Sequence, residues 1–331
     1  MEDIFKEDIE IIDEDNRFSV INTYGDDLTK RTYITNPAIA RDDEIKKLII
    51  VLLTPEKSGL LVGKPGIGKT AIVEGLAYLI QKNMVPDALK GYRIIKLNST
   101  SLIGNIEIDG REEMLMNIFV DELKQMNKTI IFIDEIHTLI GAKDAGPMDL
   151  ANMLKPALDR GQIKAIGATT TIEYDTYIIR DRAFLRRFEK IEVLEPNEET
   201  TVKILLGSLR KIEKQTGIKF KYNDYVAGQL IESIVSATSE FKRIYGLSAM
   251  YPDVAFSVLT QGFSQALFQN KSEVNVLDIY NAIKTSKRIY PDSIIKELTL
   301  FREKFKKLCS DENIVLPEVT IDEIKSVEDN Y

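Results

Sequence analysis

Eight consecutive residues have the pattern of a phosphate-binding loop, G-x-x-x-x-G-K-[ST]. They are Gly63, Lys64, Pro65, Gly66, Ile67, Gly68, Lys69 and Thr70. The glycines let backbone N–H groups turn toward phosphate oxygens, and a following helix, with Ala71 in its first turn, adds its positive dipole end. Lys69 is predicted to reach the outer phosphates, and the Thr70 hydroxyl to ligate Mg²⁺. The pattern therefore predicts a site for ATP and Mg²⁺.

The flanks of this loop decide between a nucleotide site and a glycine-rich turn that binds nothing. Residues 58–62 form a short apolar run suited to a buried strand, and residues 71–80 have apolar side chains at helical spacing. A strand, a loop and a helix in this order are what the phosphate-binding loop requires, so we favour the nucleotide site.

Two carboxylates, Asp134 and Glu135, follow a continuous apolar run at residues 129–133. Such a run is typical of a parallel strand buried on both faces, and open α/β sheets bind ligands beyond the carboxyl ends of their strands. Asp134 is predicted to hold Mg²⁺ and Glu135 to act as the general base toward the attacking water. Two exposed acids at a strand end would be unremarkable without the phosphate-binding loop.

Other residues could complete the site. A second buried strand at 163–170 ends in the hydroxyls of Thr169 and Thr170, and such a hydroxyl could sense the γ-phosphate or hold the water. Arg186 and Arg187 form either a solvated basic face or an arginine finger, which in GTPases is worth roughly 10³–10⁵ in rate. Ile39 is a candidate adenine contact, with a plain core residue as the alternative. His137 is interpreted as a hydrogen-bonded structural residue.

The elements that must position these residues follow from hydrophobic periodicity. Strands are predicted at 58–62, 93–97, 129–133 and 163–170; helices at 44–50, 71–80, 111–126, 148–160, 200–215, 225–238, 254–269, 276–286 and 292–309; and a loop at 101–110. The expected fold is an α/β, three-layer P-loop domain with a central parallel sheet, followed by an all-α lid domain. Four segments are predicted: an acidic N-terminal arm (1–33), the ATPase α/β domain (34–196), the helical lid (197–290), and a C-terminal helix with a polar tail (291–331).

Composition restricts the classes of function. The 331 residues carry a formal net charge of −8, which argues against non-specific binding to nucleic acid. There is no apolar run close to the ~20 residues that a membrane span needs. The single cysteine, Cys309, is compatible with a reducing compartment. We expect a cytoplasmic protein that binds neither membrane nor nucleic acid.

Several motifs together resemble the first ATPase ring of the Clp/Hsp100 AAA+ unfoldases. They lie at residues 36–42, 63–70, 134–139, 152–158, 167–170, 186–188 and 251–253, so the resemblance covers roughly residues 35–286. It implies an AAA+ fold, ATP hydrolysis, Thr170 as the sensor-1 residue, and Arg186 and Arg187 as fingers that reach a neighbour's nucleotide. It also implies a homo-oligomeric, hexameric ring that acts on a protein client or partner.

The chain departs from the family pattern where a client would be gripped. The family's Lys-Tyr-Arg-Gly pore loop is replaced by Glu107-Ile108-Asp109-Gly110, and the lid's usual Lys after Pro-Asp is Val254. We expect no counterpart of the family's N-terminal, middle and second-ring segments. The first hypothesis is a Clp-like AAA+ ATPase that remodels a protein partner. The second is a nucleotide-gated assembly or regulatory module that docks a partner without threading it, and DNA remodelling is the weakest. The residues identify neither the client nor a protease or second ring that docks in trans.

Overall fold

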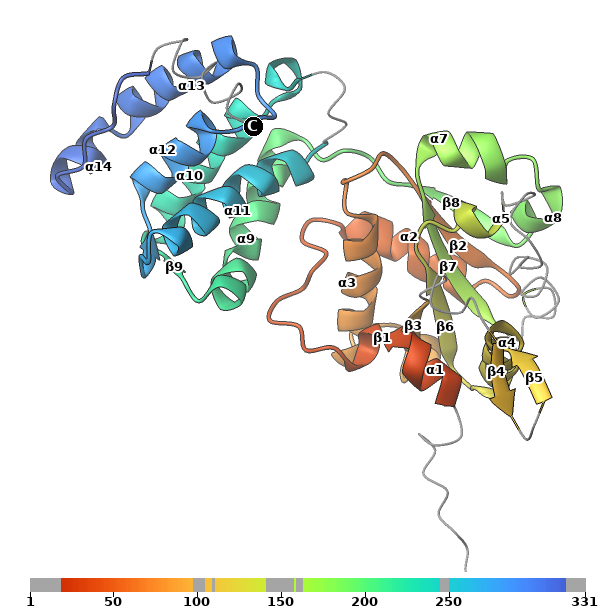
Figure 1. Ribbon diagram of the computed structural model, residues 1–331. Coiled ribbons are helices and arrows are strands. Elements are labelled where there is room, and N and C mark those ends of the chain that lie inside the picture. Colours follow the sequence, from red (N-terminus) through yellow and green to blue (C-terminus); the bar gives the residue numbers. More distant parts are fainter. Residues whose placement is uncertain are drawn as a thin grey trace, which may run out of the picture. The chain divides into compact units, whose positions relative to one another are not determined.

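A computed structural model describes residues 19–97, 105–108, 111–140, 158, 163–244 and 250–319. The chain divides into two compact units (Figure 1). We call the first the sheet unit; it comprises the described residues of 1–31, 48–60 and 80–190. We call the second the helical unit; it comprises the described residues of 32–47, 61–79 and 191–331.

The sheet unit contains most of a six-stranded sheet with the strand order β1-β3-β6-β7-β2-β8. The last two residues of β2 and the last two of β8 belong to the helical unit. Its strands are β1 (Gly25–Asp27), β2 (Ser58–Val62), β3 (Arg93–Leu97), β6 (Thr129–Ile133), β7 (Lys164–Thr169) and β8 (Phe188–Glu192). β6 pairs in parallel with β3 on one side and with β7 on the other, while β1 is antiparallel to β3. The predicted α/β fold is confirmed as a mixed sheet of mostly parallel strands.

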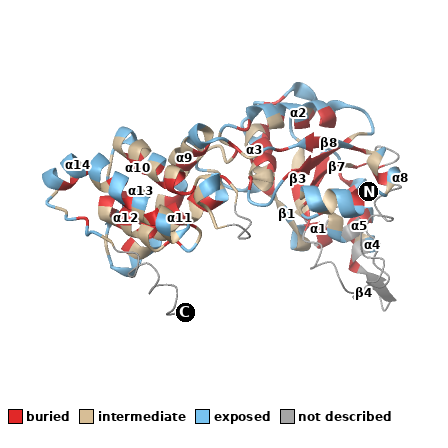
Figure 2. Cartoon of the chain, turned by 90° about the horizontal axis from the view of Figure 1, so that it is seen from above, coloured by how far each residue is buried: buried red, intermediate tan, exposed pale blue. Residues whose placement is uncertain are grey.

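The central strands are buried because their sequences are apolar throughout. All five residues of β2 and all five of β6 are buried, as are the last five of β7. Figure 2 shows β7 mostly in red, the colour of buried residues. The four strands predicted from apolar runs therefore lie where they were expected, to within one residue. Other short elements of this unit are η3 (Asp87–Leu89), α5 (His137–Ile140), α7 (Thr171–Glu173), η5 (Tyr174–Ile178) and α8 (Arg182–Leu185).

The predicted loop at 101–110 is wrong at residues 105–108, which are its described part, and the predicted helix at 111–126 is wrong in its first four residues. Residues 105–108 form β4 (Asn105–Ile108), which pairs antiparallel with β5 (Arg111–Met114), and helix α4 begins only at Leu115 (Leu115–Gln125). The overlooked signal is the Asp109-Gly110 dipeptide between the paired residues, since Asp-Gly is preferred in two-residue hairpin connections. The predicted helix at 148–160 lies outside the described residues, apart from Leu158.

Part of the segment predicted as an N-terminal arm belongs to the sheet unit. Helix α1 (Ser19–Tyr24) leads into β1 and the turn η2 (Leu28–Lys30). The carboxylate of Glu122 on α4 is buried and accepts hydrogen bonds from Val20 N (3.2 Å) and Ile21 N (2.8 Å). N–H groups in the first turn of a helix have no carbonyl partner within that helix. A carboxylate that accepts hydrogen bonds from them is therefore stabilised. The acidic stretch of residues 7–15 lies outside the described residues.

Helices dominate the chain after Pro196, as the periodicity predicted. They are α9 (Glu198–Thr216), α10 (Asp224–Ala237), η6 (Glu240–Lys242), α11 (Asp253–Phe268), α12 (Val276–Lys284), α13 (Pro291–Lys304) and α14 (Lys306–Asp311), with a small parallel pair of strands, β9 (Lys219–Phe220) and β10 (Glu273–Val274). Asn197, Asn223 and Asn275 cap α9, α10 and α12 through their side chains, which supply acceptors for otherwise unpaired N–H groups. One apolar cluster packs these helices together.

The last predicted helix, 292–309, is interrupted. Phe305 has φ −102° and ψ 13° and ends α13, and α14 starts at the next residue. Its ring lies 4.5 Å from that of Phe301, in the apolar cluster. The domain limits predicted at residues 34, 196 and 290 remain predictions. Among the described helices, none is long and apolar enough to cross a membrane.

Candidate nucleotide site

The phosphate-binding loop lies in the helical unit, between the end of β2 and the start of α3 (Lys69–Gln81). Gly66 and Gly68 have φ values of +76° and +96°, which only glycine adopts without strain. Lys69 Nζ lies across the loop and donates to Gly63 O (2.9 Å) and Lys64 O (3.0 Å). The predicted strand, loop and helix are therefore formed, and two of the loop glycines have the left-handed backbone that glycine allows.

Arg41, which was not among the predicted site residues, holds the backbone of the phosphate-binding loop through its side chain. Its side chain is buried and donates to the carbonyl of Ile67 (2.7 Å), the carbonyl of Leu194 (3.1 Å) and the carboxylate of Glu44 (2.8 Å). A guanidinium with several donors in one plane suits this arrangement. We refer to residues 63–71 together with Ile39 and Arg41 as the phosphate-loop half of the site.

The start of helix α11 approaches the same loop. A β-carbon added to Gly66 would lie 2.8 Å from Asp253 Cβ, closer than real side chains come. Asp253 Oδ2 in turn lies 3.5 Å from Arg288 Nη1. The next residue, Val254, is fully buried in the apolar cluster of the helical unit. The departure from the family's Lys therefore falls at a position that packs in a core.

Ile39, the candidate adenine contact, is half-buried. It packs on α9 at a point where the helix has no side chain, because a β-carbon on Gly207 would come within 2.5 Å of Ile39 Cδ1. This contact is compatible with both of its predicted roles, an adenine contact and a plain core residue.

The predicted carboxylates lie in the sheet unit, directly after β6. Asp134 is half-buried, and its Oδ2 lies 3.1 Å from Lys96 Nζ. Glu135 is exposed and has φ +50°, and the following amide, Ile136 N, donates to Ala168 O (3.0 Å) next to the end of β7. Asp134 therefore already forms an ion pair with the Lys96 ammonium. A ligand of Mg²⁺ must likewise be able to bind a cation.

A polar cluster joins the end of β7 to the segment after Glu135. His137 Nδ1 lies 3.2 Å from both Thr169 Oγ1 and Glu173 Oε2. Glu173 and Thr170 form a capping box at the start of α7, with Thr170 N donating to Glu173 Oε2 (3.0 Å) and Glu173 N to Thr170 Oγ1 (3.3 Å). Thr170 therefore sits at the strand end where a sensor residue was predicted. His137 is hydrogen-bonded, as interpreted from the sequence.

The pKa of Glu173, in this cluster, is lowered from its usual value. Burial raises the pKa, but the hydrogen bonds from Thr170 and Thr169 and the nearby His137 together outweigh burial and lower it. We refer to Asp134, Glu135 and Thr170, with the supporting Lys96, His137, Thr169 and Glu173, as the carboxylate half of the site.

Arg186 and Arg187 lie between α8 and β8, also in the sheet unit. The Arg186 side chain is exposed, whereas Arg187 is half-buried, with Nη1 3.7 Å from Glu56 Oε2. The backbone carbonyls of both residues are held, by Lys57 Nζ (3.0 Å) and Ser58 N (2.8 Å) respectively. The backbone is therefore fixed while the Arg186 guanidinium extends into solvent.

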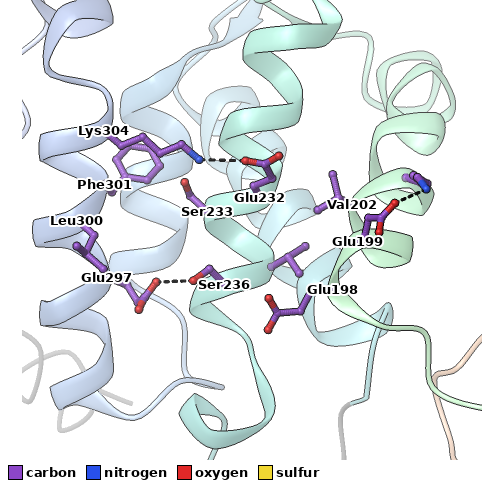
Figure 3. A pocket seen from close by; sticks show the side chains of 12 residues that line it. Glu198, Glu199, Val202, Glu232, Ser233, Ser236, Glu297, Leu300, Phe301 and Lys304 are labelled. Carbon is purple, nitrogen blue, oxygen red and sulfur yellow. Dashed lines mark hydrogen bonds and ion pairs between the residues drawn. The ribbon is translucent and has the colours of Figure 1, made fainter.

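A groove of about 650 Å³ in the helical unit contains none of the predicted site residues. It lies between α9, α10 and α13 (Figure 3). Its lining holds four carboxylates, Glu198, Glu199, Glu232 and Glu297, and two lysines, Lys203 and Lys304. Glu199 pairs with Lys203 (2.6 Å) and Glu232 with Lys304 (3.2 Å), so carboxylates are in excess in the lining. An excess of negative charge does not suit the phosphates of a nucleotide.

Comparison with known proteins agrees with this geometry. Residues 59–195 match the family model described as "ATPase family associated with various cellular activities (AAA)". The chaperone protein ClpB of Pseudomonas putida is 39% identical over 263 residues, which is 78% of this chain and 30% of that protein. A probable ATP-dependent Clp protease ATP-binding subunit of Chlamydia pneumoniae is 33% identical over 299 residues, 89% of this chain and 34% of that protein.

Among solved structures, the closed state of Hsp104 with ATPγS and FITC casein matches with a TM-score of 0.70 and 31% identity. The match covers 94% of this chain and 52% of that one. The chain spans about a third of the length of the relatives it matches in sequence.

The phosphate-binding loop, the strand-end carboxylates and the mixed sheet define a P-loop ATPase domain of the AAA type. The chain belongs, more particularly, to the Clp/Hsp100 family of AAA+ ATPases.

Proposed function

We propose that this chain binds and hydrolyses ATP as a subunit of an oligomeric ring and uses the energy to remodel a protein partner. The phosphate-binding loop, formed with left-handed glycines between a buried strand and a helix, is the observation that carries this proposal. Membership of the Clp/Hsp100 family supports it.

In this proposal the two halves of the site serve one nucleotide. The loop amides and Lys69 bind the phosphates, and Ile39 contacts the adenine. Thr70 and Asp134 would hold Mg²⁺, which when bound neutralises charge on the phosphate oxygens. Glu135 accepts a proton from the water that attacks the γ-phosphorus, and ADP leaves as the bond to its β-phosphate oxygen breaks.

Assembly follows from the role proposed for the arginines. Arg186 and Arg187 would stabilise the charge that develops on a neighbouring subunit's nucleotide, so they require a ring, which we propose to be a hexamer. The exposed side chain of Arg186 on a fixed backbone supports this role. Thr170 would report on the γ-phosphate from the end of β7.

The test is ATP turnover measured across protein concentration, with oligomer mass measured in the presence and absence of ATP. Turnover per subunit should rise as the oligomer forms. Replacing Arg186 and Arg187 by Ala should leave ATP binding intact and reduce turnover. Arg182→Ala, a change at an exposed arginine one helical turn earlier, is the matched control. A monomer that hydrolyses ATP as fast as any oligomer would contradict the ring.

One observation favours the alternative, a nucleotide-gated module that docks a partner without threading it. Where the family carries a cationic and aromatic pore loop, this chain has Glu107, Ile108 and Asp109. Acids repeated around one axis would repel acidic segments and attract basic ones. The two functions are separated by ATP-driven unfolding of a fluorescent protein with and without a basic tag. Efficient unfolding of the untagged protein would exclude the docking module, and no unfolding of either form would favour it.

A further inference from the structure

Lys96 occupies a position from which it can act on the carboxylate proposed to hold Mg²⁺. It lies on β3, paired with Phe132 of β6, two residues before Asp134. Its ammonium group is 3.1 Å from Asp134 Oδ2 and 5.5 Å from the centre of the Phe132 ring. Both side chains of the ion pair are 31% exposed, so the pair is accessible to a solvated ion.

An ammonium at this distance reduces the negative charge that Asp134 presents to a metal ion. Mg²⁺ loses its water shell reluctantly and binds through one or two carboxylates together with phosphate oxygens, so its affinity depends strongly on the charge available. Lys96 also has a flexible four-carbon stem and three rotatable donors, so it can leave the carboxylate without a change in the backbone.

We propose that Lys96 is a built-in competitor of Mg²⁺ at Asp134. It neutralises the carboxylate while no metal is present, and the metal must displace it, which raises the Mg²⁺ concentration that nucleotide binding requires. This inference rests on the proposed function, because it takes Asp134 as the metal ligand. Partly exposed ion pairs change an equilibrium by roughly 1.5- to 5-fold, which sets the size of the expected effect.

The competing interpretation is that Lys96 itself binds a nucleotide phosphate, as Lys69 is proposed to do. The two interpretations differ in what happens when Mg²⁺ is present. Removing a competitor lowers the Mg²⁺ concentration that nucleotide binding requires, whereas removing a phosphate ligand weakens nucleotide binding even at saturating Mg²⁺.

The experiment follows binding of a fluorescent, non-hydrolysable ATP analogue at increasing Mg²⁺ and in EDTA. Lys96→Met should lower the half-saturating Mg²⁺ concentration by about 2- to 5-fold and should not weaken binding at saturating Mg²⁺. Lys96→Arg keeps a cation and should stay near the parent. Lys128→Met is the matched control, since Lys128 precedes the first residue of β6 at the opposite end of the strand from Asp134. Lys96→Gln repeats the test should the Met variant fold poorly.

An unchanged or raised Mg²⁺ requirement in both Lys96→Met and Lys96→Gln would overturn the inference, as would weaker binding at saturating Mg²⁺. If the parent bound the analogue in a Mg²⁺-dependent way while all variants matched it, only this inference would fail. If the parent did not bind the analogue at all, the proposed function would fail with it.

Discussion

The two halves of the predicted site differ in what holds their residues in place. The phosphate-loop half depends on backbone shape: left-handed glycines, a lysine that spans the loop, and the buried guanidinium of Arg41 behind it. The carboxylate half depends on side chains at the ends of neighbouring strands, held by partly exposed contacts such as those of Lys96 and His137. We infer that changes in the first half act on nucleotide binding and on stability, and that changes in the second act on the metal and on turnover, with only a small effect on stability.

The largest effect is expected from Lys69→Ala, in the phosphate-loop half. It removes a charge that the backbone amides of the loop cannot replace, so nucleotide binding should be lost while the fold survives. Equilibrium binding of a fluorescent ATP analogue, with circular dichroism as the check on folding, measures this. Lys64→Ala, at an exposed lysine of the same loop, should retain most of the affinity. If Lys69→Ala bound the ATP analogue with the parental affinity, the proposed role of the phosphate-loop half in nucleotide binding would be wrong.

Glu135→Gln tests the opposite half. An amide is too weak a base to activate water, so turnover should fall by roughly 10²–10⁴-fold while Mg²⁺-ATP stays bound. Asp134→Asn should instead weaken the metal dependence of binding. Turnover at the parental rate in Glu135→Gln would mean that the general base is elsewhere.

Arg41→Ala should destabilise the fold by about 2–4 kcal/mol, because it leaves two carbonyls and the Glu44 carboxylate without the guanidinium. Arg41→Lys restores the charge but not the planar set of donors, so it should rescue only part of the loss. Arg31→Ala, which removes an exposed ion pair with Asp26, is the control and should change stability by less than about 1 kcal/mol. Urea unfolding measures all three, and equal losses for Arg41 and Arg31 would contradict the role of burial.

The smallest effect is expected at Glu173 and depends on pH. Its pKa is lowered in the folded state, so ionised Glu173 contributes stability that is fully present above the unfolded value of 4.5 and is lost as pH falls through the lower folded value. The difference in unfolding free energy between the parent and Glu173→Gln should be constant near neutral pH and shrink below about pH 4.5. A difference in unfolding free energy that grows as the pH falls below 4.5 would contradict a lowered pKa of Glu173 in the folded state.

Local signals predicted most of what the structure contains. The phosphate-binding loop, the buried strands and the helices after Pro196 depend on spacing within a few residues, and they were found. Arg41 was missed because its partner Leu194 is 153 residues away, and Lys96 because Asp134 is 38 residues away. The β4–β5 hairpin was missed because both strands are only four residues long and β5 (Arg111–Met114) lacks apolar alternation, although the Asp109-Gly110 dipeptide between them is a hairpin signal. The roles of the site residues, and the action of both halves on one nucleotide, remain predictions.

The contact between Glu122 and the start of α1 has a practical consequence for anyone who prepares a shortened chain. The resemblance to the family begins near residue 35, which invites removal of everything before it. Such a truncation would leave the buried Glu122 carboxylate without the amides of Val20 and Ile21 and would strip β1 from the edge of the sheet. An uncovered, apolar edge strand such as β3 is a template for pairing with other chains. The shortened protein would therefore precipitate during purification, and its poor yield would say nothing about its nucleotide chemistry.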